Sequence, residues 1–314
     1  MKVLFHTHTL SFRGTAVAVY DYARYNEEVL GNESVIAYNK GIPYEKDMGT
    51  EQESLDKTLS RFEVRSLTKQ NEIDSLCYDV DLAYFIRAGH PEPLPTNTKT
   101  GVHCVFQHNK PHGDVYAYIS DWLSRKMTNG VSPFVPHIVS LPEPTGDYRE
   151  KFNLKGKTVI GRFGGFYKFD IMFVRRAIKE VLEKDPDIAF LFVNTMPFMQ
   201  HERVIFLGSV VDLQKKSNYI NTCDGFIHAR QEGESFGLAL CESLFFNKPT
   251  LSWNGGRDQH HIQLLKGTEL LYDETNIVEK LLSIKDFKGD YKSIVEKFNP
   301  TDVMNKFKEV FIEG

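Results

Sequence analysis

The segment between Asp224 and Ser243 concentrates side chains whose types and spacing could do chemistry. A short apolar run, Gly225 to Ala229, leads into a loop with two carboxylates and two glycines, and that loop opens a helical pattern. Backbone N–H groups at a helix N-terminus bind anions and polar oxygens, and Ser235 is the candidate cap. Open α/β sheets bind ligands beyond the carboxyl ends of their strands. The segment therefore predicts a ligand site; the alternative is a capped surface helix with solvated carboxylates.

Two carboxylates of this segment are the candidates for ligand contact. Glu234 falls in the loop, and Glu242 follows eight positions later in the helical pattern. Eight residues would make about two turns if both were helical. With Glu234 in the loop, both carboxylates can still face one cleft at different depths.

A second segment with candidate ligand-binding side chains runs from Gly161 to Lys168 and follows an apolar run. It holds Arg162 and Lys168 around two further glycines. An Arg fork and a Lys point charge suit a diphosphate, whereas two basic residues in a loop can also be a solvated surface. We expect both cations to be loop residues at a strand end that serve a phosphate.

A third candidate is the pair His6 and His8 at the end of the first apolar run. Strand side chains alternate, so both imidazoles lie on one face and form a usable metal pair. The pattern resembles the opening of PHP-type metal phosphoesterases. No Asp-His pair follows in the next residues, and a proline-rich linker would interrupt the barrel that such an enzyme needs. We expect these histidines to line the floor of a cleft instead.

The elements that must position these residues alternate between strands and helices. In the first half, strands are expected at 2–6, 34–38, 81–86 and 102–106, with a helix over 16–23. In the second half, strands are expected at 158–161, 189–193, 204–207, 225–229 and 249–253, with helices over 171–183, 212–222 and 238–246. This order is typical of βαβ units and parallel sheets.

Four prolines between residues 133 and 144 mark the linker between two domains. We therefore expect an N-terminal Rossmann-like domain over 1–144 and a second over 145–290. The last segment, 291–314, is expected to be helical, with a break at Asn299–Pro300. It is expected to pack back toward the first domain.

Composition excludes several classes of protein. The chain has 314 residues, and Lys+Arg 38 against Asp+Glu 42 gives a net charge of −4. This balance excludes a broad nucleic-acid footprint. No window approaches 18 uninterrupted apolar residues, so no transmembrane helix is expected. The start of the chain indicates a strand and not a signal peptide. Four isolated cysteines without a CxxC pair indicate a reduced, cytoplasmic protein.

The segment from Glu234 to Glu242 resembles the E-x7-E motif of the family 4 (GT4-type) retaining glycosyltransferases. The surrounding residues, CDGFIHARQEGESFGLALCESL, follow the family pattern of strand, acidic loop, FG and helix ending in Glu. The family also carries an Arg and a Lys after the first strand of its second domain, where this chain has Arg162 and Lys168. The resemblance covers residues 155–285 well. In the first domain only the pattern of strands and helices matches. It implies a GT-B fold, with two Rossmann-like domains facing across a cleft.

The resemblance also implies roles for individual residues. Glu242 would hold ribose hydroxyls, and Glu234 would contact the transferred sugar. His108 is the nearest match to a family histidine near that sugar, although His103 and His112 lie close enough to compete. The catalytic candidates are thus His108, Glu234, Arg162 and Lys168. The donor-binding candidates are Gly14, Thr15, Arg162, Lys168, Gly208, Ser209, Val210, Glu234, Ser235, Phe236, Gly237, Leu238 and Glu242.

The activity implied is transfer of a sugar from a nucleotide-diphosphate donor to an acceptor, with retention and without a metal or other cofactor. The acceptor would be a glycan, a lipid-linked compound or a protein, reached in the cytoplasm or by peripheral contact at the inner face of a membrane. Two alternatives stay open. One is a non-catalytic nucleotide-sugar-binding protein, and the other is the metal phosphoesterase that uses His6 and His8.

Overall fold

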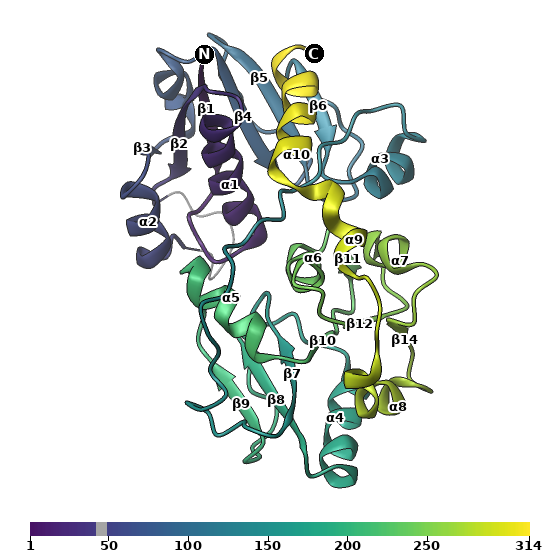
Figure 1. Ribbon diagram of the computed structural model, residues 1–314. Coiled ribbons are helices and arrows are strands. Elements are labelled where there is room, and N and C mark those ends of the chain that lie inside the picture. Colours follow the sequence, from purple (N-terminus) through teal and green to yellow (C-terminus); the bar gives the residue numbers. More distant parts are fainter. Residues whose placement is uncertain (42–48) are drawn as a thin grey trace. The chain divides into compact units, whose positions relative to one another are not determined.

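The computed structural model describes residues 1–41 and 49–314 (Figure 1). The chain divides into two compact units: Met1–Ile138 together with Phe298–Gly314 form unit 1, and Val139–Lys297 form unit 2. The sequence placed these divisions at 144/145 and 290/291. From Phe298 onward the chain belongs to unit 1.

Unit 1 is built on a six-stranded sheet in the order β3-β2-β1-β4-β5-β6, and all neighbouring strands pair in parallel. The strands are β1 (Lys2–Thr7), β2 (Glu33–Asn39), β3 (Glu63–Leu67), β4 (Leu82–Arg87), β5 (Lys99–Cys104) and β6 (Val115–Tyr118). Its helical segments are α1 (Gly14–Glu28), α2 (Gln52–Leu59), η1 (Gln70–Cys77), α3 (Asp121–Thr128), α10 (Pro300–Phe307) and the terminal turn Lys308–Ile312.

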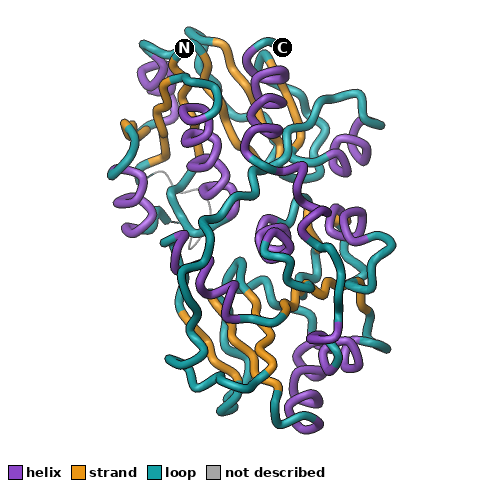
Figure 2. Tube along the Cα trace, in the orientation of Figure 1, coloured by secondary structure: helices purple, strands orange, loops and turns teal. Residues whose placement is uncertain are grey.

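Unit 2 repeats the same topology with a sheet in the order β14-β12-β10-β7-β8-β9, again parallel throughout. Figure 2 shows the helices and strands of both units by colour. The strands are β7 (Thr158–Arg162), β8 (Ile188–Val193), β9 (Val204–Leu207), β10 (Gly225–His228), β12 (Thr250–Trp253) and β14 (Leu271–Tyr272). The helices are α4 (Met172–Lys184), α5 (Leu213–Thr222), α6 (Leu238–Phe245), α7 (His260–Leu265), α8 (Ile277–Leu282) and α9 (Lys292–Val295). In both units the first and fourth strands lie side by side, which is the Rossmann strand order.

An aromatic cluster joins α1 and α10 to the sheet of unit 1. The ring of Phe307 lies 5.9 Å from Phe5, 5.5 Å from Tyr22 and 5.3 Å from Tyr84, measured between centroids. The Tyr22 hydroxyl donates to the Pro136 carbonyl at 2.7 Å. Large aromatic side chains dominate core energetics, so the C-terminal segment is an integral part of unit 1.

The break expected at Asn299–Pro300 is the start of α10. The Asn299 side chain accepts a hydrogen bond from the Asp302 N–H, and Pro300 occupies the first turn. Proline suits that position because its missing N–H would have no partner there. The helical segment expected over 291–314 is therefore several short pieces, among them α9, a 3₁₀ turn over Glu296–Phe298 and α10.

Candidate functional site

The loop between β10 and α6 is held in one conformation by two glycines. Gly237 is the N-cap of α6 with φ +86°, and Gly233 has φ +76° within the two-residue strand β11 (Gly233–Glu234), which pairs with β13 (Asp258–Gln259). A Cβ at Gly233 would lie 2.0 Å from the Asp258 carbonyl oxygen. The N-cap position of α6 belongs to Gly237 and not to Ser235, which lies two residues earlier.

Both carboxylate oxygens of Glu234 have partners within unit 2. Oε1 lies 3.0 Å from Nε2 of His228, and Oε2 accepts from Nη1 of Arg230 at 3.0 Å. His228 in turn contacts the Ser252 hydroxyl through Nδ1 at 2.9 Å. Burial raises the pKa of Glu234, but Arg230 and His228 outweigh burial and lower that pKa to about 2. Glu234 is therefore a fixed carboxylate, and each oxygen can still accept a second hydrogen bond.

His261 fixes the backbone of Glu234 from the other side. Its Nδ1 accepts from the Glu234 N–H at 3.2 Å, and its Nε2 contacts the Trp253 carbonyl oxygen at 3.0 Å. The carbonyl can only accept, so the proton lies on Nε2 and the ring is neutral. Burial lowers the pKa of His261 to about 4, in agreement with this tautomer.

Glu242 is buried, with 5% of the residue exposed. Its carboxylate pairs with the ammonium group of Lys216 on α5, and that ammonium lies 5.4 Å from the centre of the Phe163 ring. The sequence reasoning missed Lys216, because an isolated lysine in an amphipathic helix gives no signal of what it contacts. The pair is a charged group built into the interior of unit 2.

Arg162 is not a loop residue, which corrects the expectation from the sequence. It is the last residue of β7, it is 5% exposed, and burial lowers its pKa to about 10. Its guanidinium donates to the Asn194 carbonyl at 3.0 Å, the Thr195 hydroxyl at 2.6 Å and the Gly165 carbonyl at 2.8 Å. Arg162 therefore ties together the loops that follow β7 and β8.

Lys168 does lie in the loop after β7, and its side chain is half-exposed. Its ammonium lies 3.1 Å from the Glu232 carboxylate, which also accepts from Arg230 at 2.8 Å. A chain of alternating charges thus runs from Lys168 through Glu232 and Arg230 to Glu234. Arg230, Glu232 and His228 complete this network, and the sequence reasoning did not assign a role to any of them.

The remaining predicted residues fall at element ends. Gly208, Ser209 and Val210 follow β9 directly in unit 2, and Val210 packs against the core of that unit. Gly14 and Thr15 are the first residues of α1 in unit 1, not members of a glycine-rich loop. The structure therefore brings the acidic motif and the two cations together in unit 2 and places Gly14, Thr15 and His108 in unit 1.

The candidate histidines of unit 1 differ in their surroundings. His103 is fully buried, its Nδ1 lies 2.6 Å from the Tyr84 hydroxyl, and burial lowers its pKa to about 4. It is a core residue. The ring of His108 lies 3.8 Å from that of His90, and its carbonyl accepts from the Tyr118 hydroxyl at 2.9 Å. His112 contacts the Lys110 carbonyl oxygen through Nδ1 at 2.7 Å.

The geometry of His6 argues against the metal pair. Arg87 Nη1 lies 3.0 Å from Nδ1 of His6, and Asn39 Oδ1 lies 3.1 Å from Nε2. Both ring nitrogens are engaged within a fully buried side chain. Across residues 1–41 and 49–314, no three His, Cys, Asp or Glu side chains are grouped as metal ligands.

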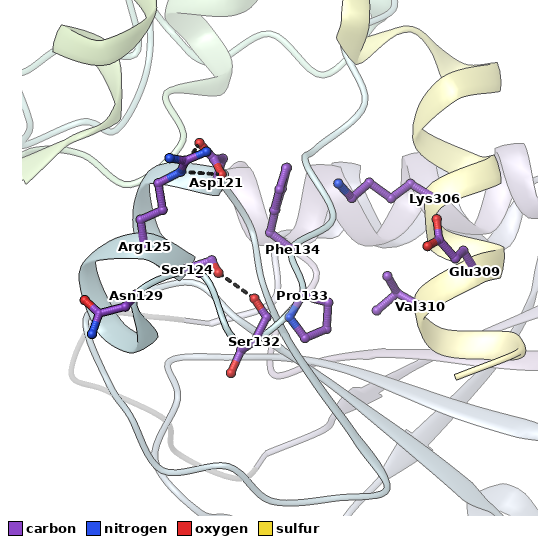
Figure 3. A pocket seen from close by; sticks show the side chains of 11 residues that line it. Asp121, Ser124, Arg125, Asn129, Ser132, Pro133, Phe134, Lys306, Glu309 and Val310 are labelled. Atoms are coloured by element: carbon purple, nitrogen blue, oxygen red, sulfur yellow. Dashed lines mark hydrogen bonds and ion pairs between the residues drawn. The ribbon is translucent and has the colours of Figure 1, made fainter.

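A hollow of about 460 Å³ in unit 1 lies apart from the predicted residues (Figure 3). It is lined by α3, the segment after α3, Lys306 of α10, and Glu309 and Val310 of the terminal turn. Asp121 pairs with Arg125 at 2.9 Å, and the Lys306 ammonium lies 3.4 Å from the centre of the Phe134 ring. None of the residues predicted from the sequence lines it.

In the described part of the chain, no helix combines the length and apolar character needed to cross a membrane.

Comparison with known proteins bears on the fold. No family model matches the chain, and no curated protein matches it in sequence. Among solved structures, Anabaena HepE in complex with UDP and glucose is similar at TM-score 0.72 and 13% identity, over 99% of this chain and 98% of that one. A glycosyltransferase from Rickettsia africae is similar at TM-score 0.66 and 15% identity, over 99% and 98%. A candidate UDP-N-acetylglucosamine 2-epimerase from Listeria monocytogenes is similar at TM-score 0.64 and 12% identity, over 100% of this chain and 97% of that one.

These similarities confirm the fold class expected from the sequence. Two parallel Rossmann-like units of the GT-B type span the chain, as they do in the glycosyltransferase structures. At these identities the likeness establishes the fold, and the activity is argued from the site.

Proposed function

We propose that the protein transfers a sugar from a nucleotide-diphosphate donor to a hydroxyl acceptor. The observation that carries the proposal is the acidic loop at the carboxyl end of β10. This loop carries Glu234 and leads into α6, which carries Glu242. Unit 2 also contains Arg162 and Lys168. HepE, which shares the fold, was solved with UDP and glucose, and the Rickettsia africae protein is a glycosyltransferase.

In this proposal the leaving group is the nucleoside diphosphate. Catalysis then requires stabilisation of the negative charge that develops on the β-phosphate as the glycosidic bond breaks. Lys168 is the exposed cation for that charge, and the N–H groups at the start of α6 add donors that need no metal. Arg162 acts through the loop that it holds, because its donors already bind Asn194, Thr195 and Gly165.

The two glutamates have separate roles. Glu242 accepts hydrogen bonds from the ribose hydroxyls, and Lys216 holds its carboxylate in place for them. Glu234 accepts a bond from a hydroxyl of the transferred sugar while His228 and Arg230 keep it oriented. The resemblance to family 4 transferases adds retention of anomeric configuration and an acceptor that is a glycan, a lipid-linked compound or a protein. The isolated cysteines add a reduced, cytoplasmic location.

Thermal unfolding with UDP-, GDP- and ADP-sugars tests the donor class. A ligand at 100 times its dissociation constant adds about 2.7 kcal/mol of stability, which raises the melting temperature by several degrees. We expect one nucleotide series to stand out. Stabilisation by none of the three would contradict the proposal.

Product analysis separates transfer from the other activities that this fold admits. NMR of the reaction with the stabilising nucleotide sugar should show free nucleoside diphosphate and a new glycoside with the anomeric configuration of the donor. An isomerised nucleotide sugar would instead identify an epimerase. Nucleotide affinity without turnover would identify a binding protein.

A further inference from the structure

The loop that carries Glu234 is held by a second segment of unit 2, to which the proposed function assigns no role. This clasp segment, residues 254–261, follows β12 and comprises β13 and the first two residues of α7. Strand β13 pairs in parallel with β11, so that Glu234 lies opposite Gln259. The clasp segment is therefore in backbone contact with the residue assigned to the sugar.

The two segments approach each other backbone to backbone. A Cβ at Gly256, which has a φ of +106°, would lie 2.7 Å from the backbone nitrogen of Gly233. The Asp258 N–H donates to the Glu232 carbonyl at 2.8 Å. Glycine permits both the left-handed conformation and the close approach. The position of one segment therefore fixes that of the other.

Two neighbouring histidines extend this contact to both sides of Ser235. Nδ1 of His261 accepts a hydrogen bond from the Glu234 N–H at 3.2 Å. Nδ1 of His260 lies 2.7 Å from the Phe236 carbonyl oxygen. A carbonyl oxygen can only accept, so Nδ1 of His260 carries a proton whereas Nδ1 of His261 carries none. The two rings use the same atom in opposite roles, and each holds one main-chain group of the acidic loop.

Both rings are fixed in the interior of unit 2. His260 and His261 are 4% and 1% exposed. The His260 ring stacks on that of Phe236 with 5.3 Å between the centroids. Nε2 of His261 donates to the carbonyl of Trp253, the last residue of β12, at 3.0 Å. Side chains that are locked by packing and hydrogen bonds hold a recognition group in the geometry that it needs.

The two glutamates of the acidic motif are held by different elements. The backbone of Glu234 is held by His261 of the clasp segment. The carboxylate of Glu242 pairs with Lys216 of α5. Loss of the contact from the clasp segment should therefore displace Glu234 and leave Glu242 in place.

We propose that His260 and His261 are positioning residues that hold Glu234 for the sugar of the donor, so that the clasp segment sets the affinity for the sugar and not for the nucleotide. The inference rests on the proposed function and deepens it, since it needs Glu234 at the sugar and Glu242 at the ribose. Both histidines act through the loop. A buried N–H that loses its acceptor is costly, so removal of the His261 lone pair shifts the loop away from its present conformation.

The test replaces His261 by residues that keep different halves of its hydrogen bonding. In His261→Asn the side-chain oxygen can take the place of Nδ1 and accept from the Glu234 N–H. In His261→Gln the longer amide reaches the place of Nε2, near the Trp253 carbonyl, and the Glu234 N–H loses its acceptor. His261→Leu removes both hydrogen bonds.

Calorimetry compares the binding of UDP and UDP-glucose, or of the corresponding GDP or ADP pair where thermal unfolding selects that nucleotide. His261→Gln and His261→Leu should bind UDP within about twofold of the wild type and UDP-glucose about tenfold or more weakly, the loss expected for one charge-assisted hydrogen bond. His261→Asn should stay within about threefold of the wild type for both ligands. A merely structural role of His261 would change the two affinities together.

His201→Leu is the matched control. His201 also belongs to unit 2, and its Nδ1 also accepts a main-chain hydrogen bond, from the Arg203 N–H at 3.1 Å. It lies between β8 and β9, outside the clasp segment. His201→Leu should therefore bind both ligands as the wild type does.

The outcomes separate this inference from the proposed function. Wild-type affinity for UDP-glucose in His261→Gln, or equal affinities in His261→Asn and His261→Gln, would overturn the role of the clasp segment. Parallel loss of UDP and UDP-glucose affinity at an unchanged melting temperature would also overturn it. Where His261→Leu does not fold, the comparison of the Asn and Gln variants decides. Failure of the wild type to bind any of the three nucleotides would contradict the proposed function itself.

Discussion

At the scale of single residues, the candidate site depends on carboxylates and cations that are already engaged with one another. Glu234 pairs with Arg230 and His228, and Glu242 pairs with Lys216. Such pairs keep charged groups in fixed positions before a ligand arrives, which lowers the cost of reorganisation. The residue identities came from the sequence, whereas these partners depend on contacts that only the folded chain creates.

Glu234 should make the stability of the protein depend on pH. Its pKa is lowered from 4.5 to about 2, so it contributes stability that is complete above 4.5 and lost as the pH falls toward 2. The shift corresponds to at most about 3 kcal/mol. Urea unfolding between pH 3 and 7 should show a shallower acid loss in Glu234→Gln than in the wild type. Parallel curves for the two proteins would contradict the ion-pair assignment.

Arg162 and Lys168 should respond differently to truncation. Arg162→Ala removes donors to two carbonyls and a hydroxyl in the interior, and hydrogen bonds to charged groups contribute about 1.5–3 kcal/mol each. It should lower the free energy of unfolding by about 3 kcal/mol or more. Lys168→Ala removes a half-exposed ammonium and should leave stability within about 0.5 kcal/mol. It should instead slow UDP release by about 10²–10³-fold, as loss of one anion-stabilising donor does.

Equal melting temperatures for Arg162→Ala and Lys168→Ala would contradict this division of roles. Near-normal UDP release in Lys168→Ala would place the diphosphate elsewhere in the molecule.

At the scale of elements, the βαβ alternation could be predicted because buried parallel strands are apolar runs. Within the two six-stranded sheets, the strands that escaped notice were β3, β6 and β14, and each lies at an edge of its sheet. Edge strands are often short or carry polar residues: Glu63–Leu67 has the sequence EVRSL, and β14 has only two residues. Ser235 was expected at the N-cap, but Gly237, with a φ of +86°, occupies that position.

The turn before α6 should be sensitive to an added methyl group. Gly233→Ala would place a Cβ 2.0 Å from the Asp258 carbonyl oxygen at a φ of +76°, so the β11–β13 pairing must shift. Left-handed backbone alone costs about 1–2 kcal/mol for a residue with a Cβ. We expect Gly233→Ala to lower the free energy of unfolding in urea by more than that amount.

Gly14→Ala is the matched control for stability. Gly14 is helical in α1, and its Cβ would meet no atom within 4 Å. Alanine in a helix is about 1 kcal/mol more favourable than glycine, so this variant should be as stable as the wild type or more so. A Gly233→Ala protein as stable as Gly14→Ala would show that the loop is not fixed as described.

At the scale of the whole molecule, two units of the same Rossmann topology carry different chemical groups. Unit 2 holds the acidic motif and the cations, and unit 1 holds a chain of contacts through Asn39, His6, Arg87, Glu92 and His8. The sequence predicted the fold class because a repeated βαβ pattern extends over the whole chain. It could not predict the network of unit 1, because Arg87 and Glu92 lie about 80 residues from His8 and meet it only in the folded sheet.

The proposed chemistry should not need a metal ion. Lys168 and the α6 N-terminus are the groups assigned to the diphosphate charge, and a helix N-terminus favours anions through its dipole and N–H groups. UDP release should therefore continue at the wild-type rate in EDTA. Loss of release in EDTA with recovery on addition of Mn²⁺ would contradict this assignment.

Calorimetry of UDP, GDP and ADP with the wild-type protein and with Glu242→Gln tests the central claim most directly. The account predicts that one nucleotide binds the wild type and that Glu242→Gln weakens it about tenfold or more, because a charge-assisted hydrogen bond contributes about 1.5–3 kcal/mol. Glu183→Gln, on the exposed surface of α4, should bind as the wild type does. Binding of none of the three nucleotides, or equal affinity of Glu242→Gln and Glu183→Gln, would contradict a nucleotide-sugar site at the acidic motif.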